Sequence, residues 1–546
     1  MVKKQPIGYI NFDGSPGENN IVEIRVPGDR LEKIRRGQYV LLESKSTGSL
    51  RVYLARVVKG PFYVPDAVSR DSAYARASIL QGDEISFRPD FHGVCLAEVL
   101  GELMDSSSLV LTGTSGRPLP QTAVTPLNGD EIEKLLGLAG DMYLGELSGY
   151  PGVRVHFRND DKKVLPRNLG VFGTVGSGKT NTSQVLIEEA SACGWAVVVL
   201  DVEGEYVEMD APSSEAEKKP AMKRLMEKYG VEPRGIENLQ VFHCTGTEPA
   251  RPEISQEFGI RFANVDVHIL GEILGLTDAQ MDRLLESYYQ LINKDEQGKT
   301  KKRKQGGLVS HLIGDIYDDS PSIGLELSDV IEAVARKAAS EKQGKVSWQV
   351  LLRKLRKLDR YRIFDTSNHL GDYSDLVKGG QVSIFDLSNS HNVWINNIVI
   401  SDILRGLFKI KLRDKESKTP PVLVIIEEAH TFVSKENVKH MEATLDVLRD
   451  ISRRGRKRWL SLCFISQQPS HLPSEIYELC NTKFVHQTTG GKNLDALKNS
   501  TGAVNDAIWG DIPVLGQGRC LIISPQFKHP VMCDMRPCSS NRRMTD

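Results

Sequence analysis

One stretch of eight residues, G-T-V-G-S-G-K-T at positions 173–180, constrains the fold of this chain more than any other feature. It matches the pattern G-x-x-x-x-G-K-[ST] at every defined position, between a short apolar run (Leu169–Phe172) and a helix-compatible run (Thr182–Ala192). Glycines in such a loop let backbone N–H groups converge on phosphate oxygens, and the start of a helix favours anions. The alternative is a glycine-rich turn without a ligand, which does not explain why strand, helix and Lys-Thr pair occur together. The sequence therefore predicts a phosphate-binding loop.

The same loop predicts which groups bind the nucleotide. We expect Lys179 to reach the β- and γ-phosphates and the Thr180 hydroxyl to bind the metal ion, so the predicted cofactors are ATP and Mg²⁺. The predicted nucleotide-binding residues are Gly173, Thr174, Val175, Gly176, Ser177, Gly178, Lys179, Thr180 and Asn181.

A second candidate group follows the apolar run at 422–426, V-L-V-I-I, which reads as a strand buried on both faces. Two acids, Glu427 and Glu428, end this strand at the sheet edge where ligands bind. We expect Glu427 to hold the Mg²⁺ shell and Glu428 to polarise the attacking water. The alternative is a solvated strand end with incidental acids. More acids follow another predicted strand in D-V-E-G-E-Y (201–206), whose role stays open between loop structure and support of catalysis.

Two polar groups flank the strand predicted at Leu460–Ile465. The basic run before it, R-R-G-R-K-R at 453–458, ends a segment with helical spacing. It is either a solvated cationic helix end or the source of an arginine finger, Arg453 or Arg456, that reaches a neighbour's γ-phosphate. Directly after the strand, Gln467 either caps the strand end or senses the γ-phosphate.

Strand and turn patterns divide the chain into three parts. Residues 1–112 carry short strands separated by turns, which predicts a small antiparallel β-barrel. Residues 113–145 form a predicted connector with one short helix (Asp130–Leu138). From 146 to 546 strands alternate with helices, which predicts a mostly parallel sheet, interrupted at about 260–375 by a helical insertion. The predicted strands are 21–26, 39–44, 52–58 and 84–87 in the first part, and 169–172, 196–200, 239–242, 382–385, 422–426, 460–465 and 483–486 in the last.

Composition limits the possible partners and surroundings. With 70 basic and 71 acidic residues the net charge is −1, which argues against a protein that coats nucleic acid but permits local basic patches. No apolar run approaches the ~20 residues needed to cross a bilayer, and the N-terminus lacks the apolar core of a signal peptide. The eight cysteines form no C-x-x-C pair. We therefore expect a cytoplasmic protein without membrane association.

Taken together, these motifs resemble those of the HerA family of hexameric DNA-translocating ATPases, within the wider HerA/FtsK group. The resemblance rests on G-T-V-G-S-G-K-T, D-V-E-G-E-Y, V-I-I-E-E-A-H and the block R-R-G-R-K-R-W-L-S-L-C-F-I-S-Q-Q-P-S with C-N-T-K-F after it. The sequence departs from the usual family pattern at Arg454, at Gln468 and at the pair Val202-Glu203. The implied fold class is α/β, a RecA-like P-loop NTPase core with a helical insertion, preceded by a small barrel like the HAS barrel of that family.

The resemblance also implies partners. It implies a homo-hexamer with ATP at subunit interfaces, double-stranded DNA in the central channel, and a nuclease or a defence effector docking on the barrel face, in DNA processing or anti-phage defence. Plausible DNA contacts are the basic loop at 299–304 and the cationic face around Arg353, although solvated surfaces explain both as well.

Two functions of different classes follow. The first is a motor, in which ATP hydrolysis drives duplex DNA through the ring. The alternative is a nucleotide-regulated ring scaffold that assembles and activates an effector with little DNA translocation. The E-E-A-H segment also resembles the D-E-x-H box of two-lobed helicases, but only about 120 residues follow Glu428, too few for a second lobe.

Overall fold

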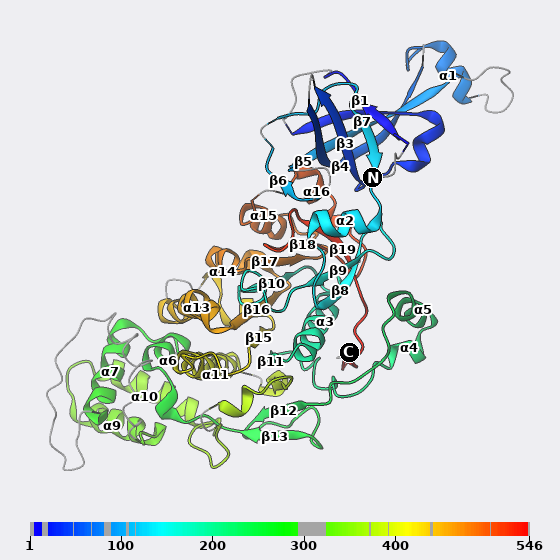
Figure 1. Cartoon of the computed structure of the whole chain (residues 1–546). Coiled ribbons are helices and arrows are strands. Elements are labelled where there is room, and N and C mark those ends of the chain that lie inside the picture. The colour runs from blue at the N-terminus through cyan, green and yellow to red at the C-terminus, as the bar shows by residue number, and fades with distance from the viewer. Residues whose placement is uncertain are drawn as a thin grey trace.

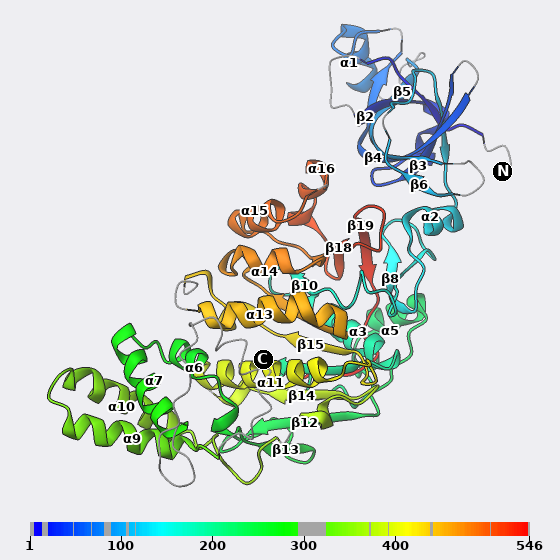
Figure 2. The same cartoon turned by 60° about the vertical axis from the view of Figure 1, so that its left-hand side comes forward.

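The computed structural model describes residues 5–13, 20–46, 49–66, 68–80, 89–104, 109–114, 116–292, 324–370, 373–390, 392–436, 441–502 and 504–543. A barrel lies at one end of the molecule and a group of helices at the other, with a large sheet between them (Figures 1 and 2). The strand predicted at 84–87 and the basic loop at 299–304 lie outside the described residues.

The N-terminal part is a closed antiparallel barrel. Its strands pair in the order β2-β1-β7-β3-β4-β5, with β6 added to β5, and a pairing between β2 and β5 closes the ring. Their inward side chains form a core of their own, because apolar residues alternate along each strand. The strands are β1 (Gly8–Ile10), β2 (Ile21–Pro27), β3 (Tyr39–Ser46), β4 (Ser49–Pro65), β5 (Phe91–Leu103), β6 (Leu111–Thr112) and β7 (Ala123–Pro126). Helix α1 (Ala73–Leu80) lies between β4 and β5 in the chain.

The segment predicted as a connector, 113–145, contains strands of both neighbouring units. Strand β7 pairs with β1 and β3 inside the barrel, and β8 (Met142–Leu147) pairs with β19 in the large sheet. Only α2 (Gly129–Leu136) lies between them, close to the predicted helix. The barrel extends past the predicted boundary at residue 112 and includes β7. The sequence did not show this because β7 has four residues, too few for an alternating pattern.

Within the described residues the large sheet has twelve strands in the order β13-β12-β14-β11-β15-β16-β10-β17-β18-β19-β8-β9. Neighbours from β13 to β17 are parallel, and those from β17 to β9 are antiparallel. The parallel strands are β10 (Leu169–Phe172), β11 (Ala196–Asp201), β12 (Leu239–Cys244), β13 (Ser255–Phe258), β14 (Val382–Asp386), β15 (Val422–Ile426), β16 (Leu460–Ser466) and β17 (Thr482–Val485). The antiparallel strands are β8, β9 (Arg154–Phe157), β18 (Arg519–Ile523) and β19 (Val531–Met535). The predicted α/β fold with a barrel before it is confirmed.

Helices cover both faces of this sheet. Side chains alternate along a strand, so Val424 and Ile426 of β15 belong to one core while Leu423 and Ile425 belong to the other. The first core is shared with α11 (Val393–Arg413), α13 (Glu442–Arg454) and α14 (Ser474–Leu479), which lie side by side in Figure 2. The second core is shared with α3 (Lys179–Ala192). The remaining helices around the sheet are α4 (Glu215–Lys218), α5 (Pro220–Tyr229), α12 (Ala429–Phe432), α15 (Gly491–Asn499) and α16 (Asp506–Trp509).

The predicted insertion is helical in its described part. It contains α6 (Val267–Ile273), α7 (Asp278–Ile292), α9 (Leu327–Ser340) and α10 (Lys345–Asp359). Apolar residues of these helices extend the first core beyond the sheet edge. Among the described residues, no helix is long and apolar enough to cross a membrane.

Candidate nucleotide site

The phosphate loop connects β10 to α3, as predicted. Gly176 and Gly178 have φ of +75° and +110°, a region that other residues enter only at a cost, so the loop needs glycine at both positions. A Cβ on Gly173 would lie 2.6 Å from His486 Cβ and 2.7 Å from Ser177 Oγ. The loop is therefore packed tightly on its inner side, while the Val175 side chain is 80% exposed at its tip.

Lys179 points into this loop. Its Nζ donates a hydrogen bond to the Thr174 carbonyl at 3.0 Å, and its side chain is buried. Burial lowers the pKa of Lys179, whereas the carboxylates of Glu428 and Glu205 favour its charge. A buried ammonium group is thus held over the loop, facing carboxylates from two other segments.

The loop is also held from outside. The Gln487 carbonyl accepts hydrogen bonds from Thr174 N at 2.8 Å and from Thr174 Oγ1 at 3.0 Å. Behind the loop, Thr182 Oγ1 lies 2.9 Å from Nε2 of His486, a fully buried residue. Burial, followed by the charge of Lys179, lowers the pKa of His486 to about 3, so its imidazole is neutral. Sequence reasoning missed Gln487 and His486 because no motif marks them.

The two acids lie at the same sheet edge as the loop. In the parallel register Phe172, directly before the loop, pairs with Ser466 of β16, and Ile426 pairs with Phe464. Strand β16 therefore separates the loop strand from the acid strand, and Gln467 lies between the two groups in the strand order. The edge thus collects a lysine, an amide and two carboxylates.

Glu427 is paired with a carboxylate that the sequence left without a role. It is level with Asp201 at the end of β11, and the two side chains are hydrogen-bonded to each other. Asp201 also accepts hydrogen bonds from Gly204 N at 2.7 Å and Tyr206 N at 2.9 Å. Burial raises the pKa of Asp201 to about 6, and burial together with the Asp201 charge raises the pKa of Glu427 well above its usual range. Because backbone donors stabilise the charge of Asp201, Glu427 carries the shared proton.

Glu428 has a strained backbone and an unsatisfied oxygen. Its φ of +42° lies in the left-handed region, which is costly for a glutamate. Its Oε2 is buried and lies 3.1 Å from Nδ1 of His430, yet it accepts no hydrogen bond from any residue that the structure describes. Nδ1 of His430 also lies 3.3 Å from Ser466 Oγ. A buried carboxylate oxygen without a donor favours an added water molecule or cation.

These features fit the predicted ligands. The loop leads into the N-terminus of α3, which favours anions, Lys179 supplies a positive charge, and the buried Glu428 oxygen lies at the same edge. The carboxylates of Glu427 and Asp201 are oxygen ligands of the kind that Mg²⁺ prefers. The donor set therefore fits a magnesium-bound triphosphate.

Arg453 and Arg456 are not part of this edge. They precede β16, whereas the phosphate loop and the acids follow the carboxyl ends of strands parallel to β16. Arg453 is exposed and Arg456 is partly exposed. Neither arginine is brought together with the predicted site of its own chain.

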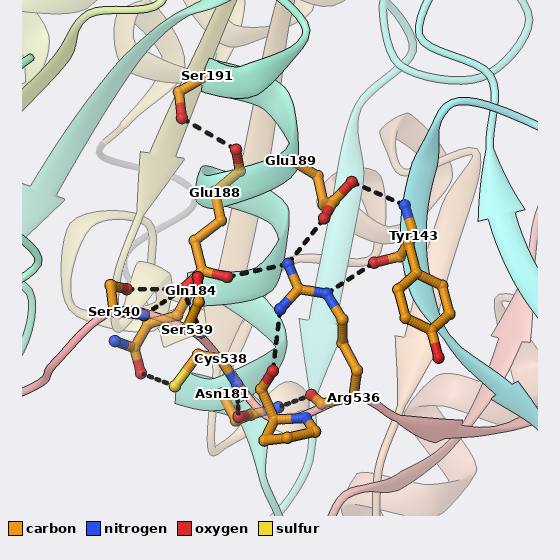
Figure 3. A network of polar contacts seen from close by, with 11 residues as sticks. Tyr143, Asn181, Gln184, Glu188, Glu189, Ser191, Arg536, Cys538, Ser539 and Ser540 are labelled. Carbon is orange, nitrogen blue, oxygen red and sulfur yellow. Dashed lines mark hydrogen bonds and ion pairs between the residues drawn. The ribbon is translucent and has the colours of Figure 1, made fainter. Parts of the chain in front are cut away.

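Asn181 does not turn its side chain toward the loop. Its Nδ2 donates to the Arg536 carbonyl at 2.8 Å, and its Oδ1 accepts from Cys538 N at 2.9 Å (Figure 3). A nucleotide contact from Asn181 would therefore come from its main chain. The C-terminal segment that binds the Asn181 side chain has no recognisable sequence motif.

The basic face around Arg353 is only partly free. On α10, Lys354 donates to the Gly275 carbonyl at 2.6 Å, and Lys357 Nζ lies 4.7 Å from the ring centre of Trp394. The side chains of Arg353 and Arg356 are exposed.

Comparison with known proteins identifies similar chains. Residues 142–407, which begin at β8, match the protein family described as "Helicase HerA, central domain". The chain is 24% identical over 504 residues to the DNA double-strand break repair helicase HerA of Pyrococcus furiosus, covering 82% of this chain and 81% of the relative. It is 24% identical over 537 residues to the HerA helicase of Sulfurisphaera tokodaii, covering 96% of this chain and 92% of the relative. Among solved structures it is similar to VirB4 of Thermoanaerobacter pseudethanolicus, at 16% identity and a TM-score of 0.49, covering 73% of this chain and 96% of that one.

Proposed function

Because the chain belongs to the HerA helicase family, we propose that it is an ATP-driven DNA translocase that works as a ring of six. One observation carries the proposal, namely the meeting of Lys179 with Glu427 and Glu428 at one buried sheet edge. This edge contains the groups that phosphoryl transfer from ATP to water requires: a charge for the phosphates, carboxylates for a metal ion and a base for water.

Each residue has a defined task in this proposal. Lys179 and the loop amides hold the β- and γ-phosphates. Because the imidazole of His486 behind the loop is neutral, it adds no second positive charge next to Lys179. Bound Mg²⁺, held by Thr180 and Glu427, supplies charge neutralisation of the phosphates. Glu428 accepts a proton from the attacking water, since no described residue donates a hydrogen bond to its buried Oε2. Gln467 donates to the γ-phosphate.

The partners in the proposal extend beyond this chain. Duplex DNA occupies the ring channel, and on the insertion the exposed Arg353 and Arg356 are the proposed phosphate contacts, whereas Lys354 is bound internally. Arg453 or Arg456 completes a neighbour's ATP site. A nuclease or defence effector docks on the barrel, which has a core of its own.

The test is ATP hydrolysis by the purified chain during a titration with duplex DNA, with the mass of the assembly measured in the same sample. We expect a mass of six chains and a rate that rises with DNA. Slow hydrolysis that is indifferent to DNA, with effector activity that depends on the ring, would instead favour the scaffold.

Two variants test the site itself. Lys179→Ala removes the buried ammonium group, so nucleotide binding should be lost. Glu428→Gln keeps the shape but not the base, so ATP should still bind while hydrolysis falls by roughly 10²-fold or more. Normal turnover by Glu428→Gln would remove this residue from its proposed role.

A further inference from the structure

The C-terminal segment Arg536–Arg543, which follows β19, lies along α3, the helix that begins at the phosphate loop (Figure 3). Three polar side chains on one side of α3, Asn181, Gln184 and Glu188, bind it. Asn181 and Glu188 each form hydrogen bonds with the main chain of the segment at two residues. A helix face with this spacing is normally apolar when it is buried, so the polar residues here are matched to the segment.

Glu188 is the most heavily used of the three residues. Its Oε1 accepts hydrogen bonds from Ser539 N at 2.8 Å, Ser540 N at 2.8 Å and Ser540 Oγ at 2.7 Å. Further along the helix, Gln184 Nε2 donates to the Asn541 carbonyl at 3.1 Å. Glu188 is buried, so loss of the segment would leave a carboxylate without donors.

Arg536 anchors the start of the segment. Its Nη2 lies 2.9 Å from Glu188 Oε2 and 2.8 Å from Glu189 Oε1, and its Nε donates to the Tyr143 carbonyl at 3.0 Å (Figure 3). Glu189 in turn accepts from Tyr143 N at 2.7 Å. The guanidinium of Arg536 is buried and balances the two carboxylates. This arrangement is strong only while every partner is present.

The other end of the segment reaches residues 204–211, which comprise the end of the acidic turn after β11 and the residues that follow it. Asn541 N donates to the Ala211 carbonyl at 2.8 Å, and Asn541 Nδ2 donates to Glu208 at 2.8 Å. Beyond it, Arg543 N donates to the Glu205 carbonyl at 3.0 Å. A Cβ on Gly204 would lie 3.7 Å from Arg543 Nη1, so the arginine side chain also lies against this turn.

The turn itself, residues 201–206, carries carboxylates of the candidate site. Asp201 holds the turn from within, and the Tyr206 hydroxyl lies 2.7 Å from Ser183 Oγ on α3. Glu205 is one of the carboxylates that favour the charge of Lys179. The C-terminal segment is therefore a second link between the phosphate-loop helix and the acidic turn, independent of the Tyr206–Ser183 contact.

We propose that residues 536–543 are a strap that positions the acidic turn against the phosphate-loop helix for ATP hydrolysis. The strap touches no reacting group, so its residues are positioning residues. Because α3 and the loop remain joined without it, the strap should govern the rate of hydrolysis more than the binding of ATP. The inference rests on the proposed ATPase function, since its readout is ATP turnover.

The experiment compares the full chain with two chains that are shortened at the C-terminus. One ends at Cys538 and keeps the Arg536 anchor but loses the link to the turn; the matched control ends at Arg543 and loses only residues 544–546. We expect the first to lose at least tenfold in kcat with KM for ATP within threefold, and the control to stay within twofold of the full chain. The full chain must turn over ATP, and its failure to do so would count against the proposed function rather than against the strap.

A point variant covers the case in which the shorter chain does not fold. Asn541→Ala removes the side-chain bonds to Glu208 and Ser214 and should lower kcat at least threefold without raising KM. Arg542→Ala, which removes an ion pair with Glu215 on α4 and leaves the bonds of Asn541 in place, should stay within twofold. An unchanged kcat in Asn541→Ala and in the chain ending at Cys538 would overturn the proposal. So would a parallel loss of nucleotide binding and thermal stability, which is the result of a merely structural role.

Discussion

The shared proton between Glu427 and Asp201 makes a prediction about stability and pH. Glu427→Gln replaces a protonated carboxyl with an amide that donates to Asp201 and still accepts the bond from Glu203 N, which lies 3.3 Å from Glu427 Oε2. The variant therefore imitates the neutral form of Glu427 at every pH. We expect it to be more stable than the natural protein at high pH, in the absence of Mg²⁺ and nucleotide.

The sign and size follow from proton binding. An acid whose pKa is raised by folding holds its proton more tightly in the folded state, so the free energy of unfolding falls as pH rises from the unfolded to the folded pKa. For Asp201 these values are 3.8 and about 6, and a difference of about two pH units corresponds to about 3 kcal/mol. The pKa of Glu427 is raised further, which extends the fall to higher pH. We therefore expect the advantage of Glu427→Gln to grow as the pH rises from 5 to 8.

Urea unfolding followed by tryptophan fluorescence measures this difference. The five tryptophans, at positions 195, 348, 394, 459 and 509, all lie outside the barrel, so the signal reports the domain that contains the site. Both proteins carry the same ionisable groups away from Asp201 and residue 427, and the difference between them cancels the contributions of those groups. A difference that does not change with pH, or a variant that is the less stable protein at pH 8, would falsify the assignment of the proton to Glu427.

Two further predictions concern the loop and the arginines. Gly173→Ala should weaken ATP binding at least tenfold because its Cβ would meet His486 and Ser177. A Cβ on Gly176 meets no described atom within 4 Å, so Gly176→Ala should weaken ATP binding only by the roughly fivefold that an alanine in the left-handed region costs. Nucleotide titration ranks the two variants, and the reverse order would contradict the packing of the loop. Arg453→Ala or Arg456→Ala should bind ATP normally and hydrolyse it ~10³-fold more slowly. Mixing the inactive variant with Lys179→Ala chains should restore part of the activity. If neither mixture recovered activity, both arginines would be solvated charges at the end of a helix.

The parallel strands were predictable because each is a short apolar run buried on both faces. The observed bounds of β10 and β15 agree with the predicted ones, and those of β16 differ by one residue. Strand β13 (S-Q-E-F) was not predicted because it lies at the sheet edge and is largely polar. Strands β18 and β19 were not predicted either, since their role as antiparallel partners depends on β8, which is distant in sequence.

The site was predictable only where its residues follow a strand or fit a motif. Lys179 and the acid pair meet as expected, because the carboxyl ends of parallel strands share one edge. The proton shared by Glu427 and Asp201 depends on register between β15 and β11, which the sequence does not specify. Arg536 and Glu188 are joined across 348 residues, and nothing in R-P-C-S-S-N-R-R marks a segment that binds a helix.

Strand geometry limits what either arginine can do in its own subunit. Strand β16 runs from Leu460 to Ser466, and seven residues at ~3.3 Å each separate its two ends by about 20 Å. Arg453 and Arg456 lie before the first end, whereas Gln467 and the phosphate loop lie at the other, so an extended arginine side chain cannot bridge the gap. If either residue acts in hydrolysis, it therefore acts on a nucleotide held by another chain. A dilution series in which the specific ATPase rate of the natural protein stayed constant down to the monomer would exclude that role for both arginines.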